Sequence, residues 1–175
     1  MMQKISLEQY KQTLTEKLKP RTLCFLISDD KVLLGKKLQG FGQGYWLGIG
    51  GKVEADETVE QAMIREGLEE ISVSPTDYKQ VATINFYFPY VENPQKWNQQ
   101  IHVFLCTAWL GEPRETEEIH PEWFDKNKLP FAYMWADAYY WLSNILHGEK
   151  LTAEFLYDKD MGIANHTISQ WSGNS

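Results

Sequence analysis

Three glutamates are clustered in the segment from residue 51 to residue 73, GKVEADETVEQAMIREGLEEISV. On a helix, Glu66, Glu69 and Glu70 stand at positions i, i+3 and i+4, so their carboxylates project from one face. Like charges at this spacing repel one another, and a divalent cation placed among them would turn that repulsion into a binding site. Because hard oxygen ligands suit Mg²⁺ and Mn²⁺, we predict a site for Mg²⁺, or for Mn²⁺ in its place. The alternative is a solvated acidic helix face.

The same segment contains the signals that start and dock a helix. Thr58 can cap the first turn, with Gln61 as its reciprocal partner. Arg65 lies four residues before Glu69, so we expect it to pair with that carboxylate and orient it. The residues expected to dock the helix on a sheet are apolar and share one face: Val59, Met63, Ile64, Leu68 and Ile71.

The spacing of the polar residues resembles the signature of the Nudix hydrolases, which is carried by a loop, a helix and a second loop. The residues that match are Gly51, Glu57, Arg65, Glu66, Glu69 and Glu70. Two positions depart from the pattern, because Gly67 stands where an apolar residue is usual and Ser72 stands where glycine is usual. Gly67 is expected to weaken the helix by about 1 kcal/mol relative to alanine. Neither departure removes a carboxylate.

The order of the expected elements indicates the fold. Two strands, RTLCFLIS and KVLLGKK, form a hairpin around Asp29 and Asp30, and after a turn at Ser74 and Pro75 come the strands VATINFYFPY and QIHVFLCTAWL. ENPQKWNQ is a polar loop, FAYMWADAYYWLSNIL a helix, and LTAEFLYD and NHTISQW are closing strands. This order fits an α/β sandwich, and the resemblance implies the same α/β/α sandwich with a mixed β-sheet.

Within the family, the chain resembles the branch that hydrolyses oxidised purine nucleoside triphosphates. The resemblance covers about residues 21 to 170, through GFGQGYWLGIGGKV, HVFLCTAWLGEPRETEEIHPEWF and PFAYMWADAYYW. It implies hydrolysis of a nucleoside triphosphate to the monophosphate and pyrophosphate, as a nucleotide-pool sanitation enzyme. The physical logic is that metal ions neutralise the diphosphate link and lower the pKa of a bound water.

The resemblance also assigns candidate catalytic residues. Glu66, Glu69 and Glu70 would hold the metal, with the carbonyl of Gly50 or Gly51 as a further ligand. Glu118 matches a loop position that adds a metal ligand or a general base, which makes Glu70 and Glu118 rival bases. The candidate catalytic set is Arg65, Glu66, Glu70 and Glu118.

The glycine-rich loop over residues 38–50 is expected to approach a ligand closely, because glycines permit close backbone contact and aromatic rings can stack on a base. Lys37 and Lys52 are candidates to bind phosphate oxygens, although a solvated surface role is equally open for Lys37. The candidate substrate contacts are Lys37, Phe41, Trp46, Leu47, Lys52, Phe86, Trp135 and Asp137.

Base recognition is where the chain departs from the branch that it resembles. That branch reads the purine with an asparagine after the loop tryptophan, and with a tryptophan followed two residues later by two adjacent aspartates. Here Trp46 is followed by Leu47, and Trp135 and Asp137 are followed by Ala138. Each lost polar contact would cost on the order of 1 to 3 kcal/mol toward that purine. We therefore expect a purine-sized pocket whose reading of the base edge is altered or relaxed.

The first 20 residues predict a short amphipathic helical extension that precedes a Nudix domain over residues 21–175. Ser6 is a possible cap and Pro20 ends the segment. The helix could pack on its own domain or on a partner subunit, and a monomer and a homodimer both stay open.

Composition bounds the remaining possibilities. A chain of 175 residues that is 43% hydrophobic is long enough for one compact domain. The net charge of -7 argues against a nucleic-acid polymer as partner. Cys24 and Cys106 lie in apolar runs and are expected to be buried free thiols, which fits a cytoplasmic protein. The polar opening and the short apolar runs predict no signal peptide and no membrane span.

Two other functions fit the sequence. The first is hydrolysis of another diphosphate, such as a nucleoside diphosphate linked to a further group or isopentenyl diphosphate, and Leu47 and Ala138 keep this open. The second is a module that binds a nucleotide without cleaving it. The complete set of acidic residues argues against the second, because a sensor has no need of the whole cluster.

Overall fold

The computed structural model describes residues 4–171, and within them one mixed eight-stranded sheet organises the chain. The strand order is β3-β2-β1-β5-β4-β7-β8, and β6 pairs with β2. Strands β1 and β5 run parallel, as do β4 and β7, while the other pairs are antiparallel. The strands are β1 (Lys19–Ser28), β2 (Lys31–Lys37), β3 (Trp46–Leu47), β4 (Ser74–Tyr87), β5 (Gln99–Leu110), β6 (Ile119–Asp125), β7 (Leu151–Tyr157) and β8 (Ile163–Gln170).

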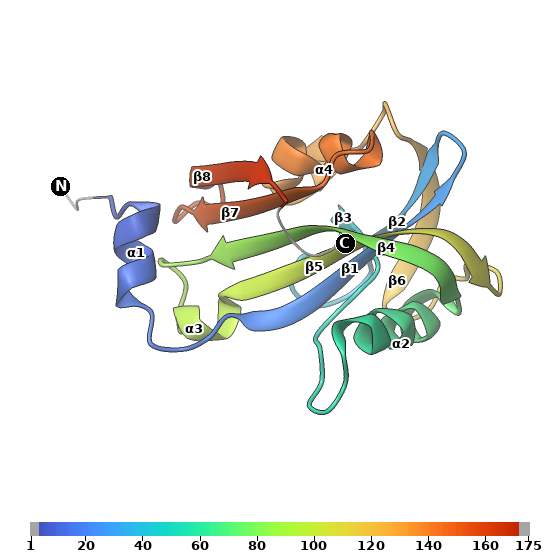
Figure 1. Ribbon diagram of the computed structural model, residues 1–175, viewed down its shortest axis with the longest axis horizontal. Helices are drawn as coiled ribbons and strands as arrows, with labels where there is room; N and C mark the ends of the chain where they lie inside the picture. The colour runs from blue at the N-terminus through green and yellow to red at the C-terminus, as the bar shows by residue number, and fades with distance from the viewer. Residues whose placement is uncertain (1–3, 172–175) are drawn as a thin grey trace.

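Two helices cover opposite faces of this sheet, α2 (Val59–Ile71) on one and α4 (Ala138–Leu146) on the other (Figure 1). Side chains alternate along β1, so Cys24 faces the apolar cluster with Met63 of α2, while Phe25 packs edge-on against Trp141 of α4. The predicted α/β/α sandwich with a mixed sheet is therefore confirmed. Cys24 and Cys106 are both buried and free, as expected.

The N-terminal helix α1 (Leu7–Thr13) is shorter than the predicted segment and packs on the sheet of its own chain. Ser6 caps it through a capping box, and its buried residues contact Tyr87 and Leu156 of the sheet. The hydroxyl of Tyr10 accepts a hydrogen bond of 2.9 Å from the side chain of Asn98. The division of the chain at residue 20 stays a prediction, and the predicted segments also include residues 1–3 and 172–175, which lie outside the described residues.

Several predicted boundaries were wrong, for local physical reasons. The expected turn at Ser74 and Pro75 is instead the start of β4. This part of β4 pairs with β5 but not with β7, so the missing amide hydrogen of Pro75 removes no hydrogen bond on the unpaired edge of the strand. The expected polar loop contains the short helix α3 (Pro94–Trp97). The expected helix over residues 131–146 divides into a 3-10 turn, η1 (Phe131–Tyr133), and α4. Across residues 4–171, no helix has the length and apolar character that crossing a membrane requires.

The end of α2 explains both departures from the family pattern. A Cβ at Gly67 would lie 2.8 Å from the carbonyl oxygen of Val73, so glycine lets β4 start close against the helix. Ser72 adopts a left-handed conformation with φ of 62°, and the amide of Val73 donates to the carbonyl of Gly67 at 3.1 Å. The turn therefore closes without glycine at position 72. Leu68, expected to dock the helix, is instead 52% exposed.

We expect Ser72→Gly to stabilise the protein by about 0.5–1 kcal/mol. Glycine avoids the energetic penalty of the left-handed backbone conformation, and this gain exceeds the additional conformational entropy that glycine loses on folding. The measurement is urea-induced unfolding of the variant and the wild type. Ser169→Gly in β8 is the matched control, because Ser169 does not have a positive φ and should lose stability as glycine. A loss of stability in both variants would contradict the prediction.

Candidate active site

Arg65 of α2 connects the acidic residues of the site. Its Nε and Nη2 donate to the two carboxylate oxygens of Glu57 at 3.1 and 2.7 Å. Its Nη1 donates to Glu66 at 3.0 Å and to Glu69 at 3.2 Å, and Nη2 also donates to the carbonyl of Lys52 at 2.9 Å. The expected contact between Arg65 and Glu69 is thus present, but the bidentate pair with Glu57 is the stronger one. This pair lowers the pKa of Glu57 and raises that of Arg65.

Glu66 and Glu70 lie on the inner side of α2 beneath the glycine-rich loop. The side chain of Glu66 is 13% exposed, and Glu70 is buried. A Cβ at Gly51 would lie 2.4 Å from Oε1 of Glu66, so any larger residue would require this carboxylate to move. The amide of Gly50 donates to Glu70 at 3.4 Å, while the carbonyl of Gly51 accepts from the amide of Thr22 at 2.9 Å.

Burial and like charge make this pair of carboxylates costly to ionise. Burial, then the charge of Glu66, raises the pKa of Glu70 to about 8, and Glu118 adds to the rise. Burial also raises the pKa of Glu66, against the effect of Arg65. Hard oxygen donors that repel one another are the donor set that a divalent cation would relieve. Across residues 4–171, no three carboxylate, imidazole or thiol groups converge on one point, and Arg65 binds the carboxylates of Glu66 and Glu69.

The two remaining acidic candidates are more open. Glu69 has a side chain that is 60% exposed, so one edge of the cluster faces solvent. Glu118 is exposed and directly precedes β6, and the backbone of this loop is tied to the start of the glycine-rich loop, where the amide of Leu38 donates to the carbonyl of Glu118 at 2.9 Å. Glu118 is thus close enough to affect Glu70 electrostatically without touching it.

A cavity of about 380 Å³ opens beside the acidic cluster. Gly50 and Gly51 line it, so the cavity and the cluster meet at the glycine-rich loop. Eight residues that the sequence nominated as substrate contacts line this one cavity: Lys37, Phe41, Trp46, Leu47, Lys52, Phe86, Trp135 and Asp137.

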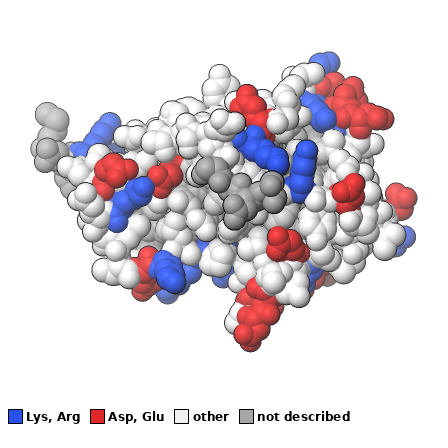
Figure 2. Space-filling view, viewed as in Figure 1, with Lys and Arg blue, Asp and Glu red and all other residues white. Residues whose placement is uncertain are grey.

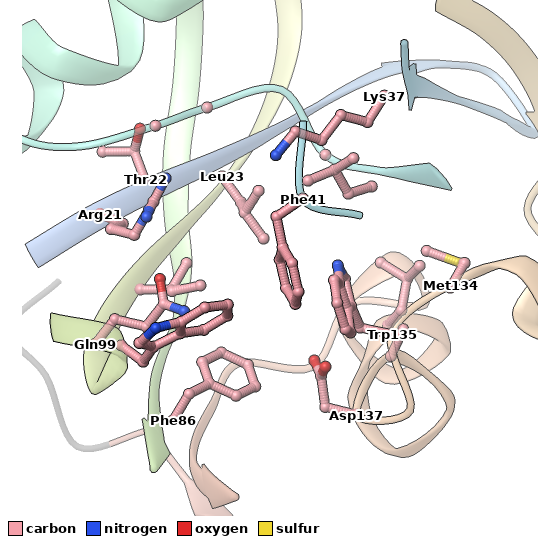
Figure 3. A pocket seen from close by; sticks show the side chains of 18 of the residues that line it. Arg21, Thr22, Leu23, Lys37, Phe41, Phe86, Gln99, Met134, Trp135 and Asp137 are labelled. Atoms are coloured by element: carbon pink, nitrogen blue, oxygen red, sulfur yellow. The ribbon is translucent and has the colours of Figure 1, made fainter. Parts of the chain in front are cut away.

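Aromatic rings form much of the cavity wall (Figure 3). Phe41 stacks on Trp135 with ring centroids 5.3 Å apart, and it contacts the edge of Trp97 at 4.6 Å. Trp97 in turn contacts Phe88 at 5.8 Å. Phe41 remains 56% exposed, so its ring is accessible at the mouth. A flat apolar ligand would find stacking surfaces here.

Among the described residues, Asp137 is the one acidic side chain that lines the cavity. Oδ2 accepts a 2.7 Å hydrogen bond from the indole of Trp141, and Oδ1 accepts a short one from the hydroxyl of Tyr157. Burial raises its pKa to about 6, although both hydrogen bonds act in the opposite direction. Leu47 and Ala138 line the same cavity. Because their side chains are apolar, neither side chain can form a hydrogen bond to a ligand.

Some lining residues were not identified from the sequence. Arg21, Trp97 and Gln99 contribute side chains from strand ends and from α3. Thr22 lines the cavity as well, and its hydroxyl is the one buried side-chain polar atom in the described part of the chain that lacks a hydrogen-bond partner. No motif marks these residues, because pairing between β1 and β5, distant in sequence, brings them together.

Comparison with known proteins places the chain in a family. Residues 17–145 match the family model described as the NUDIX domain. The chain belongs to the Nudix family. This Nudix protein is 36% identical over 149 residues to the oxidized purine nucleoside triphosphate hydrolases of Danio rerio and Mus musculus, and each alignment covers 85% of this chain and 93% of the relative.

Solved structures agree with the fold. The crystal structure of the mutator MutT protein from Bacillus halodurans superposes with a TM-score of 0.74 and covers 87% of this chain and 98% of that one. At 24% identity, this likeness concerns the fold alone. Nudix hydrolases generally use a divalent metal, and the donor set formed by Glu66, Glu69 and Glu70 is chemically suited to one.

We expect Arg65→Lys to lower kcat/KM by about 10- to 100-fold, because lysine keeps the charge but cannot form the forked contacts that orient the carboxylates. The measurement is steady-state hydrolysis beside a thermal unfolding curve. Arg114→Lys, an exposed arginine outside the site, is the matched control. Wild-type activity in the Arg65 variant would show that the network does not orient the site.

Asp137 is expected to make stability fall as pH rises. Its pKa in the folded protein, about 6, lies above the ordinary value of 3.8, so the folded state holds a proton that the unfolded state has released. The stability from this proton is present at pH 5 and is lost through pH 6, by about 1 kcal/mol between pH 5 and 7.5.

The Asp137→Asn variant lacks this titration. Its free energy of unfolding relative to the wild type should therefore rise by about 1 kcal/mol from pH 5 to pH 7.5, measured by urea denaturation. The exposed Asp30→Asn is the control. A difference that does not change with pH would show that Asp137 titrates as it does in the unfolded chain.

Proposed function

We propose that this Nudix protein hydrolyses a nucleoside triphosphate, with oxidised purines as the preferred bases, to the monophosphate and pyrophosphate with Mg²⁺, or with Mn²⁺ in its place. One observation carries the proposal: Gly50 and Gly51 line a cavity walled by aromatic rings, and the same two glycines lie against the carboxylates of Glu70 and Glu66. A base in the cavity would thus leave its phosphates at the acidic cluster. The substrate named for the two vertebrate relatives supports the same reading.

Each acidic residue has a role in this proposal. Glu66, Glu69 and Glu70 hold the metal, which when bound supplies charge neutralisation and a water of lowered pKa. Gly50 is the better carbonyl ligand of the two glycines, because the carbonyl of Gly51 already accepts from Thr22. Arg65 orients the carboxylates through its hydrogen bonds to Glu57, Glu66 and Glu69.

Glu70 and Glu118 are rival general bases. Glu70 is buried on α2 beside Glu66 and accepts from the amide of Gly50, at the rim of the cavity. Glu118 is exposed and directly precedes β6, in a loop whose carbonyl at Glu118 accepts from the amide of Leu38 in the glycine-rich loop. Both stay in the proposal.

Base binding rests on Phe41, Trp46, Phe86 and Trp135 as apolar surface, and on Asp137 as the polar contact. Lys37 and Lys52 bind phosphate oxygens. Figure 3 shows the carboxylate of Asp137 below Trp135 and beside the open part of the cavity. Because Leu47 and Ala138 offer no hydrogen bond, the base edge is read with fewer polar contacts than in the branch that the chain resembles.

The same two apolar residues favour one second candidate, hydrolysis of another diphosphate such as a nucleoside diphosphate linked to a further group or isopentenyl diphosphate. A module that binds without cleaving has no such observation in its favour. Two buried free cysteines support a cytoplasmic location. A monomer or homodimer, with no nucleic-acid polymer and no membrane as partner, remains the expectation.

The test is pyrophosphate release with Mg²⁺ across a panel that includes oxidised dGTP and dATP, the unmodified triphosphates and nucleoside diphosphate derivatives. We expect kcat/KM to be at least about tenfold higher for an oxidised purine, which is the discrimination that one good polar contact provides. Equal turnover of purines and pyrimidines would count against the proposed base preference.

Glu70→Gln tests the metal assignment in the same assay. Because the amide cannot act as an anionic ligand or as a base, we expect kcat to fall by about 100-fold or more. Glu60→Gln, an exposed residue in the first turn of the same helix, is the matched control. Unchanged turnover by the Glu70 variant would remove Glu70 from the site.

A further inference from the structure

A second depression, of about 300 Å³, lies next to the aromatic cavity and is lined by basic side chains. We call it the basic trough. It is lined by Lys19, Pro20, Arg21, Lys52, Val53, Lys96, Trp97 and Gln99. Four of these eight residues carry a positive charge, and none carries a negative charge. This composition contrasts with the net charge of -7 of the whole chain.

The cations of the basic trough stand on backbone segments that are joined by hydrogen bonds. The amide of Lys19 donates to the carbonyl of Asn98, directly after α3, at 3.1 Å. The amide of Val53 donates to the carbonyl of Pro20, also at 3.1 Å, and Arg21 pairs with Lys52 in an antiparallel bridge. Three segments distant in sequence are thus held side by side, so the charges are brought together by the fold.

The charges of Glu66 and Glu70 oppose the lowering of the pKa of Arg21 by burial, whereas the lysines of the trough have few acidic partners. Lys19 lies 3.8 Å from Glu16, but both side chains are more than half exposed, and such a pair is weak. In the described residues, Arg21, Lys52 and Lys96 form no salt bridge. On the face seen in Figure 2, acidic and basic side chains are interspersed. Lysines that are held together with so few acidic partners repel one another, and an anion would relieve that repulsion.

The basic trough continues from the candidate active site. Arg21, Lys52, Lys96, Trp97 and Gln99 line both the trough and the aromatic cavity. Lys52 directly follows Gly51, whose Cα lies against the carboxylate of Glu66. In Figure 3, Arg21 and Gln99 lie on the side of the cavity away from Trp135. A ligand whose base contacts Trp135 could therefore extend past the acidic cluster into the trough.

We propose that the basic trough binds the terminal phosphates of the substrate, the β- and γ-phosphates that leave together as pyrophosphate. The trough thereby selects nucleoside triphosphates over two other classes of compound. These are nucleoside diphosphates, and diphosphates that are linked to an uncharged terminal group. This inference rests on the proposed function and adds to it the residues that distinguish a triphosphate from a diphosphate. In this proposal Lys19, at the start of β1, and Lys96, in α3, contact the terminal phosphate.

The experiment compares the wild type with the double variant Lys19→Gln/Lys96→Gln on a tri- and a diphosphate of the same purine nucleoside. Both lysines are exposed, so the variant should fold normally, and a thermal unfolding curve checks this. We expect KM for the triphosphate to rise by about tenfold with the loss of two charge-assisted contacts. KM for the diphosphate should rise less than KM for the triphosphate, because Lys96 also lines the aromatic cavity. Lys79→Gln/Lys128→Gln, at exposed lysines outside both cavities, is the matched control.

A second measurement does not depend on turnover. Calorimetric titration with pyrophosphate, without a nucleotide, should show binding to the wild type and to the control variant, and about tenfold weaker binding to the trough variant. If the wild type hydrolyses no triphosphate but binds pyrophosphate through these lysines, the proposed function is wrong, whereas the assignment of the trough as a phosphate-binding site is supported. Unchanged triphosphate KM and pyrophosphate affinity in the trough variant would overturn the inference. An equal loss for the tri- and diphosphate would also overturn it.

Discussion

The forked contact between Arg65 and Glu57 is the interaction on which the candidate site depends. Glu57 and Lys52 belong to the loop before α2, whereas Arg65, Glu66 and Glu69 belong to the helix, so a single guanidinium joins loop and helix. This junction keeps Gly51 over Glu66 and thereby places the rim of the aromatic cavity at the acidic cluster. The positive charge of Arg65 also offsets part of the repulsion among the neighbouring carboxylates. Burial already opposes the ionisation of these carboxylates.

Chemistry and recognition are provided by different parts of the fold. The acidic residues stand mainly on α2, on one face of the sheet, while Trp135 and Asp137 lead into α4, which covers the other. The glycine-rich loop is the segment that reaches both, because Gly50 and Gly51 touch the acidic cluster and Phe41 stacks on Trp135. A change of substrate can thus arise in the aromatic wall while the arginine network remains intact.

Local signals made much of the site predictable from the sequence. The cap at Thr58, the acidic face of α2 and the glycine-rich loop depend on residues within about one helix length of one another, and the structure contains all three. Long-range pairing was not readable in the same way. Trp97 and Arg21 reach the cavity only because β1 lies beside β5, and Pro75 lies in a strand because one side of β4 is unpaired there. The exposure of Leu68 likewise depends on which side of α2 meets the sheet.

The hydrogen bond between Tyr10 and Asn98 spans 88 positions in the sequence and links α1 to the end of α3. Asn98 is buried and also accepts from the amide of Phe88, so this one side chain fastens the segment that carries Trp97 and Lys96. The N-terminal helix therefore supports one wall of the cavity. A change in α1 that breaks this hydrogen bond would therefore act on the cavity wall at Trp97 without touching the residues of the Nudix signature.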